Sequence, residues 1–322
     1  MINMQGFEVW AEKYRPKSLK EVINQRHVVE RLKAFVKGKN IPHCLFAGSA
    51  GTGKTTCALS MANDLFGKGW KNYVLELNAS DTRGIDTIRG QVKEFSRIKS
   101  LGKIPFKFII LDEADNLTGD AQQALRRTME NFTQTARFIL ICNYSSKIID
   151  PIQSRCAVFR FKSLAEKDIE TFIGRIVTGE KLKIDGSAKK ALIELSEGDL
   201  RKVANLLQAS SSVGKKITGN TVYDVASQAK PKDVRQMLEL ALKGNFREAR
   251  NRLHDMILKQ GLAGQDIIKE IHRQIYDLKI SDDDKVKLVD KTGEYDFRIS
   301  EGGTDLIQLE ALLTHFLLLS KK

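Results

Sequence analysis

Hydrophobic residues follow two different patterns along the chain, and the change between them falls near residue 163. Before that point, short and nearly continuous apolar runs alternate with segments whose apolar residues recur at helical spacing. The runs predict strands over residues 43–47, 73–77, 107–111, 136–142 and 157–161. Such runs are typical of parallel strands buried on both faces, and the intervening helices indicate right-handed crossovers. The pattern therefore predicts an α/β fold with a parallel five-stranded sheet that binds ligands at the carboxyl ends of its strands.

After Ser163 the strand pattern disappears and helical spacing continues to the end of the chain. One group of helices is expected over residues 166–177, 187–196 and 200–209, with Asp199 as the N-cap of the last. A second group begins near Lys232 and ends in a leucine-rich stripe. A chain of 322 residues is long enough for two or three domains. We therefore expect an α/β domain over residues 1–163, a small helical lid over 164–229 and an all-helical domain over 230–322. The leucine-rich stripes of the last domain are typical of a bundle core, and a separate helical domain also provides a surface for self-assembly.

The clearest chemical motif follows the first expected strand, where residues 48–55 read Gly-Ser-Ala-Gly-Thr-Gly-Lys-Thr. A Gly-x-x-x-x-Gly-Lys-Thr loop between a strand and a helix binds phosphates, because glycines let the backbone approach the anion and N–H groups at the helix start point at it. Lys54 is expected to reach the β- and γ-phosphates, and the Thr55 hydroxyl to bind Mg²⁺. The alternative, a glycine-rich turn without a ligand, does not explain these flanks. The ATP-binding residues predicted here are Gly48, Ser49, Ala50, Gly51, Thr52, Gly53, Lys54, Thr55 and Thr56.

Acidic residues follow the third expected strand, in the run Asp-Glu-Ala-Asp at 112–115. An Asp at the end of a strand beside a phosphate loop can hold Mg²⁺, and the next acid can orient an attacking water. We assign Asp112 to the metal and Glu113 to the water; otherwise these acids only cap the helix expected over 119–130. Asn143 ends the fourth strand, where its amide could bind a γ-phosphate or the water, although Asn is also a common turn residue.

An aromatic and aliphatic segment precedes the phosphate loop, over residues 9–40. Such a segment could pack around an adenine ring, and by periodicity it could equally be a core-packing helix. The residues assigned to ATP binding in this segment are Tyr14, Arg15, Pro16, Val22 and Ile23.

Composition narrows the class of protein. A net charge of +13 and a pI near 9.5 favour a polyanionic partner, nucleic acid above all, although solvated lysines give the same count. The four cysteines form no Cys-x-x-Cys pair, so neither a disulfide framework nor a zinc site is expected. The chain has no apolar run of about 18 residues and does not begin like a signal peptide. We therefore expect an intracellular protein without a membrane partner.

Short motifs along the chain carry a resemblance to a known family. They are Glu12–Pro16, the phosphate loop, Leu77–Asp81, Asp112–Asp115, Ala124–Glu130, Cys142–Tyr144, Ser154–Cys156 and Gly198–Arg201. In this order they closely resemble the small subunits of replication factor C, the clamp loader, and most of all the archaeal form. The resemblance implies an AAA+ ATPase that uses ATP and Mg²⁺ and has a helical lid and an all-helical collar. It further implies a five-membered ring with a large subunit and other small subunits, which loads a sliding clamp of the proliferating-cell-nuclear-antigen type onto primer–template DNA.

The resemblance also implies roles for individual residues. Arg155 would be an arginine finger that reaches the ATP of the neighbouring subunit, Arg201 a lid arginine that senses the γ-phosphate, and Asn143 the sensor at the strand tip. The catalytic set is then Glu113, Lys54, Arg155 and Asn143. The residues expected to follow the DNA backbone are Arg83, Arg89 and Lys147, for which solvated surface charge is the alternative.

The carboxyl-terminal end departs from a clamp-binding box, because Ala311 stands three residues after Gln308 where a larger aliphatic residue is wanted. Clamp contact is therefore expected near Ile98–Phe106. Two other functions stay open: a ring subunit that binds nucleotide without hydrolysing it, and a related AAA+ ATPase such as a branch-migration helicase. The latter would carry a winged-helix domain with strands. An archaeal-type chain would be cytoplasmic, and a eukaryotic one nuclear.

Overall fold

A computed structural model describes residues 8–81, 84–100, 104–214 and 216–319. Contacts between residues group the described parts of Met1–Leu182 and Ile193–Gln208 into one unit, and those of Lys183–Leu192 and Ala209–Lys322 into a second. The expected boundaries at 163 and 229 remain a prediction. Among the described residues, no helix is long and apolar enough to cross a membrane.

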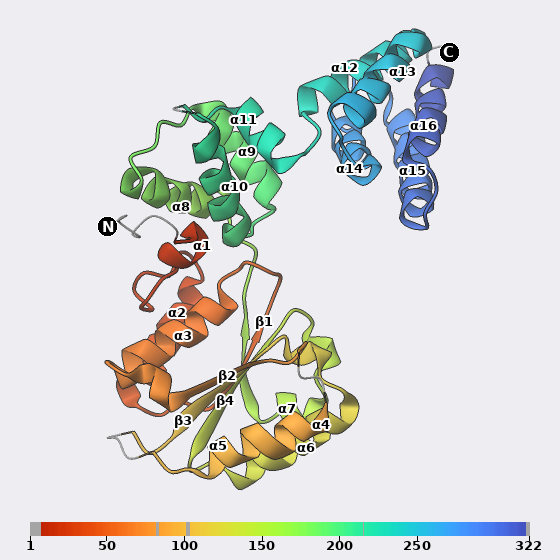
Figure 1. Cartoon of the computed structure of the whole chain (residues 1–322). Helices are drawn as coiled ribbons and strands as arrows, with labels where there is room; N and C mark the ends of the chain where they lie inside the picture. The colour runs from red at the N-terminus through yellow and green to blue at the C-terminus, as the bar shows by residue number, and fades with distance from the viewer. Residues whose placement is uncertain (1–7, 82–83, 101–103, 215, 320–322) are drawn as a thin grey trace. The chain divides into compact units, whose positions relative to one another are not determined.

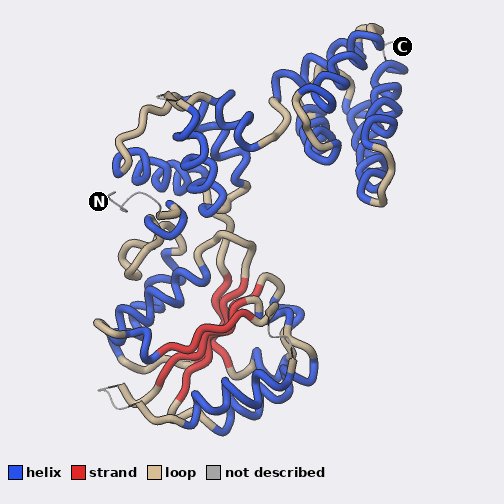
Figure 2. The backbone as a smooth tube through the Cα atoms, in the orientation of Figure 1, coloured by secondary structure: helices blue, strands red, loops and turns tan. Residues whose placement is uncertain are grey.

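The first unit contains a sheet of five parallel strands in the order β2-β3-β4-β1-β5, drawn in red in Figure 2. The strands are β1 His43–Ala47, β2 Val74–Asn78, β3 Lys107–Asp112, β4 Ala136–Cys142 and β5 Cys156–Arg160. The predicted parallel five-stranded sheet is confirmed. Strand β2 begins one residue later than predicted, because Tyr73 ends the short 3-10 helix η1 (Trp70–Tyr73).

Helices cover both faces of the sheet, as Figure 1 shows. Helices α2 (Arg26–Gly38) and α3 (Lys54–Phe66) pack on the face to which Phe46 points. The opposite face, which receives Leu45, is covered by a second group of helices. These are α4 Ile85–Thr87, the π-helix η2 Ile88–Val92, α5 Lys93–Arg97, α6 Gly119–Asn131 and α7 Asp150–Gln153. Successive strand residues point to opposite faces, so both faces are apolar and the runs read as continuous.

The strand order brings together chain segments that are distant in the sequence. Strand β4 lies between β3 and β1, and the register pairs Leu111 with Leu140 and Ala47 with Cys142. The phosphate loop, the acids after β3 and the residue after β4 therefore emerge side by side at the carboxyl edge of the sheet. Smaller elements of this unit are α1 Trp10–Lys13 and the 3-10 helices η3 Ala114–Asn116 and η4 Ser145–Lys147.

The described residues after β5 form helices, as predicted. They are α8 Glu166–Gly179, α9 Gly186–Ser196, α10 Leu200–Val213, α11 Gly219–Ala226, α12 Pro231–Leu242, α13 Phe246–His254, the π-helix η5 Asp255–Lys259, α14 Gly264–Ile275, α15 Asp282–Ser300 and α16 Asp305–Leu319. Helices α12 to α16 share one apolar core around Met237, Ile271 and Phe316. The apolar pattern did not single out α15, because charged residues separate its few buried side chains such as Leu288 and Tyr295.

Candidate nucleotide-binding site

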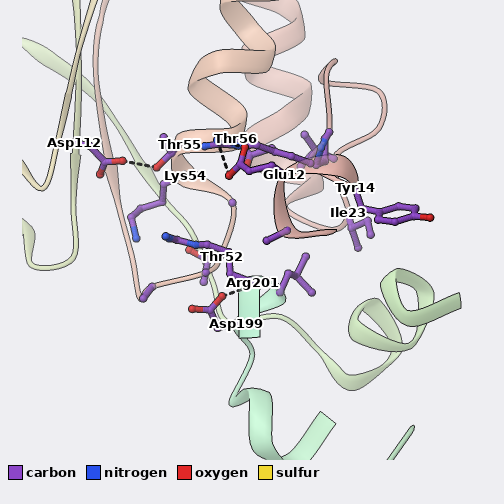
Figure 3. A pocket seen from close by; sticks show the side chains of 18 of the residues that line it. Glu12, Tyr14, Ile23, Thr52, Lys54, Thr55, Thr56, Asp112, Asp199 and Arg201 are labelled. Carbon is purple, nitrogen blue, oxygen red and sulfur yellow. Dashed lines mark hydrogen bonds and ion pairs between the residues drawn. The ribbon is translucent and has the colours of Figure 1, made fainter. Parts of the chain in front are cut away.

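A cavity of about 430 Å³ lies in the first unit, at the carboxyl edge of the sheet. Residues from α1, the phosphate loop, the ends of β2, β3 and β4, and the start of α10 form its wall. Figure 3 shows this wall from close by. The predicted residues that lie on it are Tyr14, Arg15, Pro16, Val22, Ile23, Ala50, Gly51, Thr52, Gly53, Lys54, Thr55, Thr56, Asp112, Glu113, Asn143 and Arg201.

The phosphate loop connects β1 to α3 through backbone conformations that favour glycine. Gly51 has φ +70° and Gly53, the residue before α3, has φ +92°. A Cβ atom on Gly51 would stand 2.1 Å from Cγ of Asp199, so no larger residue fits there. The loop therefore leads straight into the start of a 13-residue helix, where free N–H groups can bind an anion.

Lys54 is the first residue of α3, and its side chain is folded into the loop. Its Nζ donates to the carbonyl oxygens of Gly48 and Ser49, both at 2.7 Å, and to Oδ1 of Asn143 at 3.1 Å. Only 7% of the residue is exposed, and this burial lowers the pKa of the ammonium, while the nearby Asp112 carboxylate opposes the shift. Gly48 and Ser49 thus lie behind the wall and hold the lysine through their carbonyl groups.

Thr55 and Asp112 form an oxygen pair at the base of the cavity. The Thr55 hydroxyl donates to Oδ2 of Asp112 at 2.6 Å, the contact marked by a dashed line in Figure 3. The other carboxylate oxygen, Oδ1, accepts from the backbone N–H of Glu113 at 2.8 Å. Mg²⁺ prefers oxygen ligands and usually takes one or two carboxylates together with substrate phosphates, so this pair fits it. Among the described residues, no group of three or more His, Cys, Asp or Glu side chains could hold a metal.

Glu113 has an unusual backbone. Its φ of +52° is in the left-handed region, which costs a residue with a Cβ about 1–2 kcal/mol. Its Oε2 accepts from Nδ2 of Asn116 at 3.2 Å, and the residue lies on the cavity wall. Strain of this kind is concentrated at functional sites, where the surrounding structure imposes it.

Helix α10 supplies the opposite side of the cavity. Oδ1 of Asp199 accepts from the backbone N–H of Arg201 at 2.8 Å, so Asp199 caps the helix as the sequence predicted. Figure 3 shows Asp199 and Arg201 near Thr52 of the phosphate loop. The Arg201 side chain is exposed, and its charge contributes to lowering the pKa of Lys54.

The amino-terminal segment closes another side of the cavity. The Tyr14 hydroxyl donates to Oε1 of Glu180 at 2.7 Å, and Lys13 forms an ion pair with the same oxygen at 2.6 Å. Burial raises the pKa of Tyr14 to about 12, and the hydrogen bond to Glu180 adds to the shift. This segment is thereby held at its place on the wall, next to the end of α8.

Several residues on the wall were not among those that the sequence assigned to the site: Ala11, Glu12, Glu76, Asn78, Cys142, Phe172, Asp199 and Leu200. Asp199 and Leu200 could have been added, because they directly precede the predicted Arg201. Phe172 has no such signal, since its spacing on α8 is that of any core-facing helical residue.

Arg155 does not line this cavity. It precedes β5, whose first residue Cys156 pairs with His43 at the start of β1, so it lies at the amino edge of the sheet. Its guanidinium forms an ion pair with Oε1 of Glu130 at 2.6 Å and donates to the carbonyl of Pro151 at 2.7 Å. The side chain is 39% exposed.

The residues predicted to contact DNA also lie outside the cavity wall. Arg89 on η2 and Lys147 on η4 are exposed, and the Lys147 ammonium lies 5.3 Å from the centre of the exposed Tyr144 ring. Arg83 is outside the described residues. In the segment expected to contact the clamp, Ile98 is 60% exposed whereas Phe106 is buried, and residues 101–103 are not described.

Two family models match the chain. The ATPase family associated with various cellular activities (AAA) matches residues 44–164, which include the phosphate loop and the acids after β3. The replication factor C C-terminal domain matches residues 229–315, which include α12 to α15.

Three replication factor C small subunits are similar to this chain over nearly its whole length. The chain is 54% identical to the replication factor C small subunit of Staphylothermus marinus, covering 98% of this chain and 96% of the relative. It is 54% identical to that of Sulfolobus acidocaldarius, with 98% and 97% covered, and 48% identical to that of Archaeoglobus fulgidus, with 99% and 100% covered. A solved structure of the Thermotoga maritima RuvB Holliday junction branch migration motor has a TM-score of 0.56 at 19% identity and covers 78% of this chain and 86% of that one. At that identity the likeness concerns the fold alone.

Proposed function

Because this chain belongs to the replication factor C small subunit family, we propose that it loads a sliding clamp onto primer–template DNA at the expense of ATP. Its AAA domain makes it a member of an ATPase family. In the proposed function, a ring of this subunit with a large subunit uses the ATP to open a clamp of the proliferating-cell-nuclear-antigen type. The observation that carries the proposal is the single cavity shared by Lys54, Asp112 and Glu113.

In this proposal, each of these side chains has a task in hydrolysis. Lys54 exchanges its contacts with neutral carbonyls for the β- and γ-phosphates, which are stronger, charged acceptors. Glu113 orients the water whose oxygen attacks the γ-phosphorus, and it accepts the proton as the bond to ADP breaks. Asn143 and Arg201 contact the γ-phosphate from two sides. Thr55 and Asp112 would hold Mg²⁺, which neutralises charge on the phosphates when bound.

Arg155 supplies the contact between subunits in this proposal. It lies at the opposite edge of the sheet from its own phosphate loop, and it is exposed with an exchangeable surface ion pair to Glu130. Exposed pairs of this kind contribute about 0–1 kcal/mol, so a phosphate can displace Glu130 at low cost. We therefore assign Arg155 to the ATP held by a neighbouring copy.

We assign DNA binding to the exposed cations Arg89 and Lys147. Arg83, which the sequence also predicts to contact DNA, lies outside the described residues. Contacts with phosphates hold a duplex without reading its sequence. This property suits a loader that acts at any primer end.

Glu113→Gln tests the proposal. This change keeps the size of the side chain and removes its ability to accept a proton. We expect ATP binding within about threefold of the wild type, hydrolysis reduced by about 10²–10⁴ as for a lost general base, and no multiple rounds of clamp loading on primed circular DNA. Glu30→Gln, on the exposed face of α2, is the matched control and should load normally.

The same experiment separates the alternatives. If Glu113→Gln loads clamps repeatedly, the chain is a structural ring subunit that does not hydrolyse ATP. A branch-migration helicase would instead move DNA junctions without a clamp. Against that function, the described residues of 231–319 contain no strand, whereas a winged-helix domain requires them.

A further inference from the structure

Asp115 makes an unusual set of contacts just behind the cavity. It follows Glu113 by two residues and lies in η3. Its Oδ2 accepts from the backbone N–H groups of Asn143 at 3.2 Å and of Tyr144 at 3.1 Å. Its Oδ1 is buried and has no hydrogen-bond partner. A buried carboxylate oxygen without a partner is costly, so the contacts of Oδ2 must serve a purpose that apolar packing would not.

The two N–H groups belong to the point where the chain leaves the sheet. Strand β4 ends at Cys142, whose register partner on β1 is the last residue of that strand, Ala47. The Gly48 N–H donates to the Cys142 carbonyl, so Cys142 faces β1 and the N–H of Asn143 faces the other neighbour, β3. Strand β3 has already ended at Asp112 and turned into η3, so it offers no further strand backbone to pair with. Asp115 therefore takes the place of a neighbouring strand for Asn143 and Tyr144. It joins the loop after β3 to the loop after β4.

Asp115 holds the backbone of Asn143, and the side chain of Asn143 contacts Lys54. Oδ1 of Asn143 accepts from Nζ of Lys54 at 3.1 Å, and the Asp115 carboxylate itself helps to raise the pKa of Lys54 against the effect of burial. A shift of the Asn143 backbone would move its amide relative to the phosphates. Catalytic groups lose activity steeply when they are displaced by about 1 Å.

We propose that Asp115 is a positioning residue for ATP hydrolysis, which acts by holding the backbone of Asn143 so that its amide meets the γ-phosphate. This inference rests on the proposed ATPase function and on the sensor role of Asn143. It assigns Asp115 no contact with ATP, because the residue is not part of the cavity wall.

The test compares four variants of the full-length chain, assembled with its large subunit: Asp115→Ala, Asn143→Ala, the double variant and Asp115→Asn. Asp115→Ala should bind ATP within about threefold of the wild type and lower kcat about 10- to 100-fold, as expected for a lost positioning contact. The double variant should be no slower than Asn143→Ala, because residues that act through one another are not additive. Asp115→Asn keeps an oxygen acceptor and should recover most of kcat.

A direct readout comes from hydrogen exchange. The amides of Asn143 and Tyr144 should exchange faster in Asp115→Ala and remain slow in Asp115→Asn. The matched control is Asp185→Ala, which removes a carboxylate that accepts from the Ala188 N–H at 2.8 Å outside the cavity and should leave kcat unchanged.

The outcomes distinguish a failure of the Asn143 sensor role from a failure of the Asp115 positioning role. Wild-type turnover in Asn143→Ala would overturn the sensor role that the inference rests on. If Asn143→Ala is slow while Asp115→Ala turns over normally, the inference alone is wrong. Additive losses in the double variant, or equal losses in Asp115→Asn and Asp115→Ala, would also overturn it.

Discussion

The two edges of the parallel sheet hold buried cations in different surroundings. At the carboxyl edge the Lys54 ammonium is bound by carbonyl and amide oxygens on the wall of a cavity. At the amino edge the Lys107 ammonium lies 3.9 Å from the centre of the Phe95 ring, and Arg137 lies over Phe106 and donates to backbone carbonyls. Burial lowers the pKa of both lysines.

The difference shows that burial of a cation does not by itself make a binding site. Oxygen acceptors around Lys54 can be exchanged for phosphate oxygens, and the cavity gives the phosphates room. The Phe95 ring beside the Lys107 ammonium has no oxygen acceptor that a phosphate oxygen could replace, and Lys107 is not on the cavity wall. Arg155 is the exception at the amino edge, because it is exposed and its contacts with Glu130 and the Pro151 carbonyl are ones that a phosphate can replace.

The largest effect is expected for substitution of Arg155. Arg155→Ala should lower turnover of the assembled ring by about 10³–10⁵, the range for arginine fingers, and leave ATP affinity unchanged. Phosphate release and nucleotide titration measure the two quantities. Glu130→Gln removes the ion-pair partner but keeps the arginine, so it should retain turnover. Undiminished hydrolysis in Arg155→Ala would remove the role in the neighbouring cavity.

A matched pair of lysine substitutions tests the comparison itself. Lys54→Met should weaken ATP binding at least about 100-fold, because two or more charged hydrogen bonds to phosphate are lost, each of about 1.5–3 kcal/mol. Lys107→Met keeps the apolar stem over Phe95 and should leave ATP affinity unchanged. Calorimetric titration with MgATP measures both. An equal loss in the two variants would show that the edges do not differ as we infer.

His43 makes the amino edge sensitive to acid. Burial, helped by the charge of Arg137, lowers its pKa from 6.5 to about 4, and its Nδ1 accepts from the Phe138 N–H at 3.1 Å. The folded state therefore favours the neutral ring, and stability falls as the pH drops from about 6.5 towards 4. Between pH 7 and pH 5 the loss should be about 2 kcal/mol.

Urea unfolding of the first unit measures this loss, because the two tryptophans, Trp10 and Trp70, both belong to that unit. His43→Asn keeps an acceptor for the Phe138 N–H and cannot take up a proton. Its stability should change less than that of the wild type over the same pH range. Identical pH dependence in both proteins would contradict the assignment.

The smallest effect is expected on DNA binding, which we assign to exposed cations and not to buried ones. Replacing Arg89 and Lys147 by Ala should weaken binding about equally for all sequences and reduce the salt slope by about 0.9 for each lost phosphate contact. The control replaces Lys33 and Lys37, exposed lysines of α2 on the opposite face of the sheet. Equal slopes in the wild type and the Arg89, Lys147 variant would refute the assigned surface.

Some features of this protein follow from local sequence alone. The strands of the sheet, the phosphate loop and the Asp199 cap were all predicted, because apolar runs, glycines at left-handed positions and a cap before a helix act over a few neighbouring residues. The family also follows from the sequence, because each of its motifs is a run of a few neighbouring residues.

Other features were decided only by the tertiary structure. That β4 lies between β3 and β1 depends on how whole strands pair, and this pairing brings Asn143 to Lys54 and the Asp115 carboxylate to the N–H of Asn143. Phe172 reaches the cavity wall because α8 packs there, although its spacing is that of any core residue. The sequence alone thus determined the strands, the phosphate loop and the family. The neighbours of each site residue were decided by long-range packing, because contacts between distant segments leave no mark in the local pattern.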